Sequence, residues 1–189
     1  IGGEYKWQSY APYLQGFAKI ELENIAKKAW KNGIKAQVFN APEILTNSSS
    51  IFLGIEVALY PLLGALQKEK ESSSLVKDLL ARCNKLLKPD YKIESILDLT
   101  SEYFKSEIIS QRWSDFPGWP QHNGPEQMKL MRETSQKIID MHITDKELLT
   151  SELSEVVFKS CGKAMISCAY DPQQPVWWIG HDIVAKLCD

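Results

Sequence analysis

Residues suited to ligand binding gather in one short stretch of the chain, 112–125, which reads RWSDFPGWPQHNGP. Its three prolines and two glycines predict a loop. Loops lie at the surface, where exposed aromatic rings are unfavourable, so the two tryptophans either pack down as a lid or face a ligand or partner. Aromatic faces stack on planar ligands and attract cations, and the Arg, Asp and His side chains of the loop would add directional polar contacts.

A second group of candidates lies near the C-terminus, in the segment 176–182, where two adjacent tryptophans precede a His-Asp pair. Aromatic rings line small-molecule pockets, and tryptophan and arginine are enriched at protein interfaces. We therefore predict that the loop and this segment meet in space and form one binding surface; the alternative is that the rings only seal the core. The predicted binding residues are Arg112, Trp113, Asp115, Trp119, His122, Trp177, Trp178 and His181.

The adjacent His181 and Asp182 also permit a metal site, because such a pair supplies two ligands in metal-dependent phosphohydrolases of the HD type. That chemistry needs an earlier histidine, for which His142 is available, and a later aspartate, for which only Asp189 remains. The simpler interpretation is that Asp182 caps the last helix and His181 packs beside it. A metal-dependent phosphohydrolase is therefore an alternative function, and we assign no metal ligands.

Four cysteines, at positions 83, 161, 168 and 188, show no zinc-ligand spacing. A cysteine nucleophile would need a nearby histidine, and inert buried thiols are the commoner case. The sequon at Asn47 would suit a secreted protein. We favour reduced cysteines, and with them a cytoplasmic over a secreted location.

Composition narrows the classes of function. A net charge of −2 gives no electrostatic footprint for nucleic acid, so no nucleic-acid partner is expected. The sequence holds no glycine-rich dinucleotide or P-loop motif and no serine-hydrolase elbow. At 189 residues, 1–189 is predicted to be a single domain, and because it begins with Ile1 we expect a processed product or an excised domain.

Helical periodicity dominates the elements that must position these residues. Helix 9–31 carries an apolar stripe and should end at Asn32-Gly33. The predicted fold is mainly α, a single globular domain of about six or seven helices with a small C-terminal β-hairpin, or alternatively α+β. The other predicted elements are helices 51–66, 75–87, 92–111, 125–142, about 145–160 and 182–187, a short strand at 34–39, and hairpin strands at 164–170 and 176–179.

The segment 51–66 is the most apolar of the chain and contains one charged residue, Glu56. A membrane-spanning helix needs about 20 apolar residues, and this segment has sixteen. We predict a buried central helix, kinked near Pro61, in which Glu56 must find a partner. A membrane-active protein that uses this segment is a further alternative, although a membrane partner is not expected.

Together these patterns predict a non-catalytic domain that binds a small molecule or a partner protein through loop 112–125 and the Trp-Trp segment. They leave the ligand and any cofactor unassigned.

Overall fold

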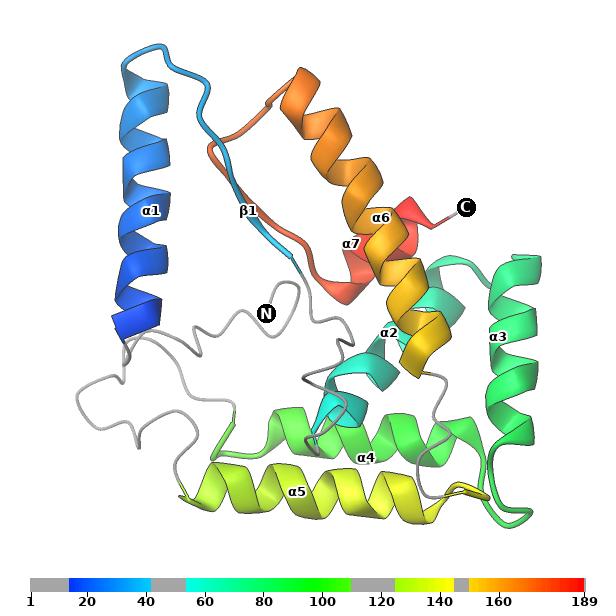
Figure 1. Cartoon of the computed structure of the whole chain (residues 1–189). Coiled ribbons are helices and arrows are strands. Elements are labelled where there is room, and N and C mark those ends of the chain that lie inside the picture. Colours follow the sequence, from blue (N-terminus) through cyan, green and yellow to red (C-terminus); the bar gives the residue numbers. More distant parts are fainter. Residues whose placement is uncertain (1–13, 42–53, 110–124, 145–149, 189) are drawn as a thin grey trace.

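The structure is a computed structural model that describes residues 14–41, 54–109, 125–144 and 150–188 (Figure 1). This part of the chain is mainly α-helical, as predicted, with seven helices and one two-stranded sheet. The elements in chain order are α1 (Leu14–Lys31), β1 (Val38–Asn40), α2 (Ile55–Glu69), α3 (Ser74–Lys85), α4 (Ile93–Lys105), α5 (Pro125–Asp140), α6 (Thr150–Tyr170), β2 (Val176–Trp178) and α7 (His181–Leu187).

Helix α2 is the centre of the core, because α3, α4, α5, α6 and α7 all pack against it (Figure 1). Its leucines and Tyr60 are fully buried. A helix that is apolar on nearly every side is stable only when neighbours surround it. The buried central helix predicted from 51–66 is thus confirmed for the described residues 55–66, and the membrane-active alternative is wrong. Within the described ranges, no helix combines the length and apolarity needed to cross a bilayer.

Glu56 finds its hydrogen-bond partner at the start of α2. Its side chain is buried, and one carboxylate oxygen accepts a hydrogen bond from the backbone N–H of Gly54 at 3.1 Å. A negative charge in the first turn also interacts favourably with the helix dipole. Gly54 has φ +125°, and a Cβ built there would lie 2.7 Å from the sulfur of Met131, so the turn requires glycine.

The predicted C-terminal hairpin is wrong. β2 pairs with β1 from the other end of the chain, and the two strands are parallel, with Phe39 opposite Trp177. A parallel pair needs a long crossover rather than a tight turn. Here the crossover contains helices α2 to α6, so local sequence signals could not reveal the pairing.

The segment 164–170, predicted as the first hairpin strand, is the end of helix α6. Its apolar residues looked strand-like as a short run, but the buried positions across the whole helix follow helical spacing. The helix predicted to end at about residue 160 continues to Tyr170, and Gly162 lies inside it with nothing near the place of a Cβ. The buried residues of this face are Leu153, Val157, Cys161, Ala164 and Cys168.

Helix α1 ends where predicted, with Gly33 at φ +79° and its N–H bonded to the carbonyl of Trp30 at 3.0 Å. Its apolar stripe, however, does not face the core. Leu22 and Ile25 are exposed, and Ala26 is the residue of this helix that is buried among those described. Spacing predicts which residues share a face, but it does not show what covers that face.

Candidate functional site

The predicted binding residues of the loop, Arg112, Trp113, Asp115, Trp119 and His122, lie outside the described residues. The other three, Trp177, Trp178 and His181, are described and lie close together at the carboxyl end of the sheet. The structure therefore gives the geometry of the C-terminal half of the predicted surface.

The rings of Phe39 and Trp177 lie against each other across this small sheet in a tilted arrangement. Trp177 is half-buried and lies against Phe39, with ring centroids 5.9 Å apart and planes inclined by 48°. Trp178 is opposite Asn40 and is exposed. The backbone N–H of Ile179 donates to the carbonyl of Asn40 at 2.9 Å, which extends the pairing to the point where the chain turns into α7.

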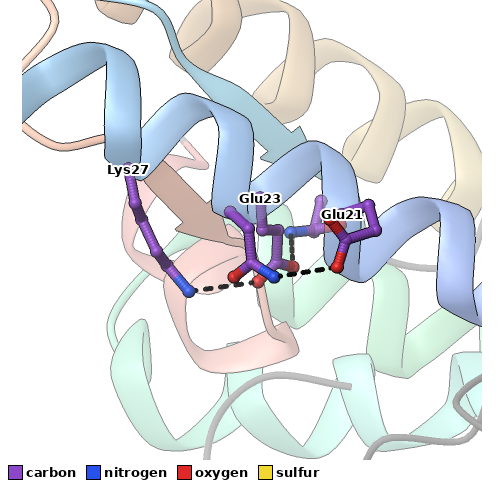
Figure 2. Close-up of polar contacts among 5 residues, drawn as sticks. Glu21, Glu23 and Lys27 are labelled. Atoms are coloured by element: carbon purple, nitrogen blue, oxygen red, sulfur yellow. Dashed lines mark hydrogen bonds and ion pairs between the residues drawn. The ribbon is translucent and has the colours of Figure 1, made fainter.

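Helix α1 holds β1 in place through polar contacts (Figure 2). The side-chain amide of Asn40 donates to Glu23 at 3.1 Å, and Lys27 lies 3.7 Å from the other carboxylate oxygen of Glu23. Asn24 donates to Glu21 at 3.2 Å on the same side of the helix. These contacts fix the strand that carries Asn40 and so the position of its neighbour Trp178.

His181 begins α7 directly after the strand, at the carboxyl end of β2. The residue is half-buried, but its Nδ1 is buried and has no hydrogen-bond partner among the described residues. Burial lowers the pKa of His181 to about 4, against the opposing effects of the Ala58 backbone and of Asp182. The imidazole is therefore neutral at pH 7, and a buried ring nitrogen without a partner is a group that a ligand atom could satisfy.

Asp182 does not cap the last helix. The cap residue of α7 is Gly180, and it makes no side-chain capping bond. The helix begins one residue earlier than predicted, so Asp182 lies in its first turn, where a negative charge still interacts favourably with the helix dipole.

His142 lies elsewhere, in a buried polar chain between α2, α3 and the end of α5. Its Nδ1 is 2.7 Å from the carbonyl of Ile138, and its Nε2 is 2.6 Å from the hydroxyl of Tyr60. The thiol of Cys83 donates to the same hydroxyl at 3.8 Å. A carbonyl only accepts, so Nδ1 carries the proton, Nε2 accepts from Tyr60, and both nitrogens are used.

The phosphohydrolase alternative fails on this geometry. His142 has no nitrogen left for a metal, and no group of three metal-ligating residues occurs in the part of the chain that the structure describes. Burial lowers the pKa of His142 and raises the pKa of Tyr60, so the chain of hydrogen bonds stays uncharged. The sequence indicated His142 as a possible metal ligand and did not single out Tyr60 or Cys83. The available signal was that each of these polar residues lies within an apolar stripe.

All four cysteines are buried, and none of them forms a disulfide. Burial raises the pKa of Cys83 to about 11 and also raises the pKa of Cys161 and of Cys168. A raised pKa lowers the thiolate fraction, which is the reactive form, so these three thiols are poor nucleophiles.

Comparison with known proteins decides the class of the molecule. Residues 1–188 match the family model described as enoyl-acyl carrier protein reductase FabMG. The chain belongs to this family. The apo structure of FabMG, a novel type of enoyl-acyl carrier protein reductase, is 40% identical with a TM-score of 0.80, over 96% of this chain and 41% of that one. The NADH-bound structure of FabMG is 39% identical with a TM-score of 0.69, over 96% of this chain and 43% of that one. No curated protein matches.

The FabMG match overturns the predicted function. A chain that belongs to a reductase family is not explained as a non-catalytic binding domain, so that prediction is wrong. The missed information was not in any short motif: the glycine-rich signals searched for are absent from the sequence. The chain spans less than half of the FabMG structures that it matches.

The described residues do not form a dinucleotide site of the Rossmann type. A Rossmann-type site combines a strand, a glycine-rich turn and a helix whose N-terminus meets the pyrophosphate. Among the described residues the sheet has two strands of three residues, and the turn between β2 and α7 contains one glycine, Gly180.

Proposed function

We propose that the chain is the helical region of an NADH-dependent enoyl-acyl carrier protein reductase. Such an enzyme saturates the carbon–carbon double bond of an enoyl thioester, with NADH as the hydride source. The observation that carries the proposal is the family match over residues 1–188, supported by 40% identity to a solved FabMG structure across 96% of the chain.

Within that enzyme, we assign this region to the acyl-substrate side rather than to the cofactor. The described residues show no glycine-rich phosphate site of the Rossmann type, whereas an apolar acyl chain needs a concave aromatic and aliphatic lining with few polar groups. Trp177, Trp178 and His181 lie at the carboxyl end of two parallel strands, the edge at which α/β proteins place ligands. The loop residues Arg112, Trp113, Asp115, Trp119 and His122 are proposed as the opposite wall.

Four buried cysteines that form no disulfide also suit a reducing compartment, which supports a cytoplasmic location.

The test uses a chimera that joins this chain to the part of FabMG that it does not cover. We expect this chimera to oxidise NADH only when an enoyl thioester is present, followed by the loss of nicotinamide absorbance. A chimera that is folded by circular dichroism but inactive with enoyl thioesters of several chain lengths would contradict the proposed reaction.

Two variants test the acyl side. Trp178→Ala and His181→Asn should raise the KM for the enoyl thioester about tenfold, on the order of 1.4 kcal/mol of binding, and leave the KM for NADH unchanged. Tyr91→Ala is the matched control, because it removes an aromatic side chain of similar exposure that is distant in sequence from the sheet. A rise in the KM for NADH instead would place these residues on the cofactor side.

A further inference from the structure

Helix α6 carries two apolar faces, and the fold covers only one of them. The inner face packs against the core through residues such as Leu153 and Val157. The outer face exposes large apolar side chains over more than three turns, namely Phe158, Met165, Ile166 and Tyr170. A helix that is apolar on both sides is normally buried on both sides.

Helix α4 shows what an outward face looks like elsewhere in the same molecule. Its exposed residues include Glu94, Asp98, Glu102 and Lys105, which is the usual composition of a solvated helix face. On α6 the charges of the outer side include Glu155 and Lys159, and they bond to each other at 2.6 Å. The outer side of α6 thus combines these two charges and the exposed Lys163 with four exposed large apolar side chains, whereas the exposed residues named on α4 are all charged.

Helix α1 presents a second surface of this kind. Leu22 and Ile25 lie on the stripe that spacing predicted as inward, yet both are exposed. Helix α1 packs chiefly on the strands β1 and β2, and α6 leads directly into β2, so both helices adjoin the two-stranded sheet (Figure 1). Large apolar side chains that gather at an exposed surface are a feature of interaction sites.

We propose that the outer faces of α1 and α6 are the surface on which the rest of the reductase polypeptide packs. This inference rests on the proposed function. The FabMG structures are more than twice as long as this chain and share its fold over 96% of its length, so a large covalently linked body is available to cover both helices. Interfaces between parts of one polypeptide mix apolar with polar residues, as the exposed sides of α1 and α6 do.

Thiol labelling tests the proposal, because the four native cysteines are buried and react slowly. We would introduce Ile25→Cys or Ile166→Cys and measure the rate of reaction with N-ethylmaleimide. The isoleucines replaced are 61% and 63% exposed. Ile143→Cys is the matched control, since this isoleucine is 59% exposed and lies outside both helices.

In the isolated chain, we expect all three variants to react at similar rates. In the chimera with the remainder of FabMG, the thiols at positions 25 and 166 should react at least about tenfold more slowly, and the control should be unchanged. Unchanged labelling at either position would overturn the inference. A second outcome would also overturn it. If labelling of the isolated chain is already slow and becomes slower at higher protein concentration, a second copy of the chain covers these positions.

Enoyl reductase activity of the same chimera separates the two proposals. An active chimera with unprotected thiols would remove the docking surface and leave the proposed function intact. A chimera with protected thiols and no activity on any enoyl thioester would keep the docking surface and remove the proposed function.

Discussion

Helices α2 and α1 are both apolar on one side or more, yet the molecule uses them in opposite ways. Five helices surround α2 and bury its leucines completely. Helix α1 rests chiefly on two short strands and leaves Leu22 and Ile25 exposed. The difference shows that an apolar stripe identifies the side of a helix that needs a packing partner. It does not identify the partner, which can lie elsewhere in the protein or in a longer polypeptide.

The polar contacts of the core and of α1 also differ in how far they are buried. In the core, Cys83, Tyr60 and His142 form a chain in which each polar atom is used and none is charged. Around α1, the contacts of Glu23 with Asn40 and Lys27 are half-buried or exposed to solvent (Figure 2). Buried hydrogen bonds are costly to break because water cannot replace the lost partner, whereas solvent compensates the exposed ones.

The largest expected difference comes from truncating a leucine in each helix. Leu63→Ala in α2 removes a side chain with no exposed surface and should lower the free energy of unfolding by about 2–5 kcal/mol. Leu22→Ala in α1 should change it by less than about 0.5 kcal/mol, because the leucine is already exposed. Urea denaturation of both variants measures the contrast. Equal losses would show that α1 is as well packed as α2.

Removing the central hydroxyl of the buried chain should have the next largest effect. Tyr60→Phe keeps the ring but leaves Nε2 of His142 and the Cys83 thiol without their partner, at a cost of about 1–3 kcal/mol. Tyr91→Phe, on an exposed tyrosine, is the control and should be neutral. Urea midpoints of the two variants measure this, and a neutral Tyr60→Phe would mean that the chain of hydrogen bonds adds nothing to stability.

The free energy of unfolding should also decrease as the pH is lowered, because two histidines have lowered pKa values in the folded chain. The pKa of His142 and that of His181 lie below the ordinary value of 6.5, the latter at about 4. The unfolded chain then binds protons that the folded chain does not, so stability is full above about pH 6.5 and declines towards about pH 4. The slope is at most about 1.4 kcal/mol per pH unit for each proton.

His181→Asn isolates one of these protons. Urea midpoints measured for this variant between neutral and acid pH should fall less steeply than those of the parent chain. Parallel curves for the two proteins would show that His181 is protonated equally in both states, and hence that its ring is not buried.

The smallest effects are expected at the contacts of α1. Asn40→Ala removes a half-buried hydrogen bond to Glu23 and should cost about 0.5–1.5 kcal/mol. Lys27→Ala removes an ion pair at a distance of 3.7 Å whose lysine is exposed, and should change stability by about 0.5 kcal/mol or less. A larger loss for Lys27→Ala than for Asn40→Ala, by thermal unfolding, would reverse the ranking of these contacts.

Much of the fold could be predicted from local patterns. Residue type and spacing, which act over a few residues, predicted the end of α1 before Gly33, the start of α5 at Pro125 and the burial of 55–66. The candidate site was harder to predict. Trp177, Trp178 and His181 were singled out by composition, but their neighbours Phe39 and Asn40 come from a strand more than a hundred residues away.

The sequence by itself therefore determined that the chain is helical, which helix is central, and that Glu56 needs a partner, because propensity, periodicity and burial cost are local properties. Only the tertiary structure decided that β1 and β2 are parallel, that 164–170 is helical, and that Tyr60 and His142 are hydrogen-bonded to each other. The physical reason is that these contacts join segments far apart in the sequence, whose pairing depends on the packing of everything between them. The same holds for α1 and α6, whose apolar faces are visible in the sequence and whose exposure is visible only in the fold.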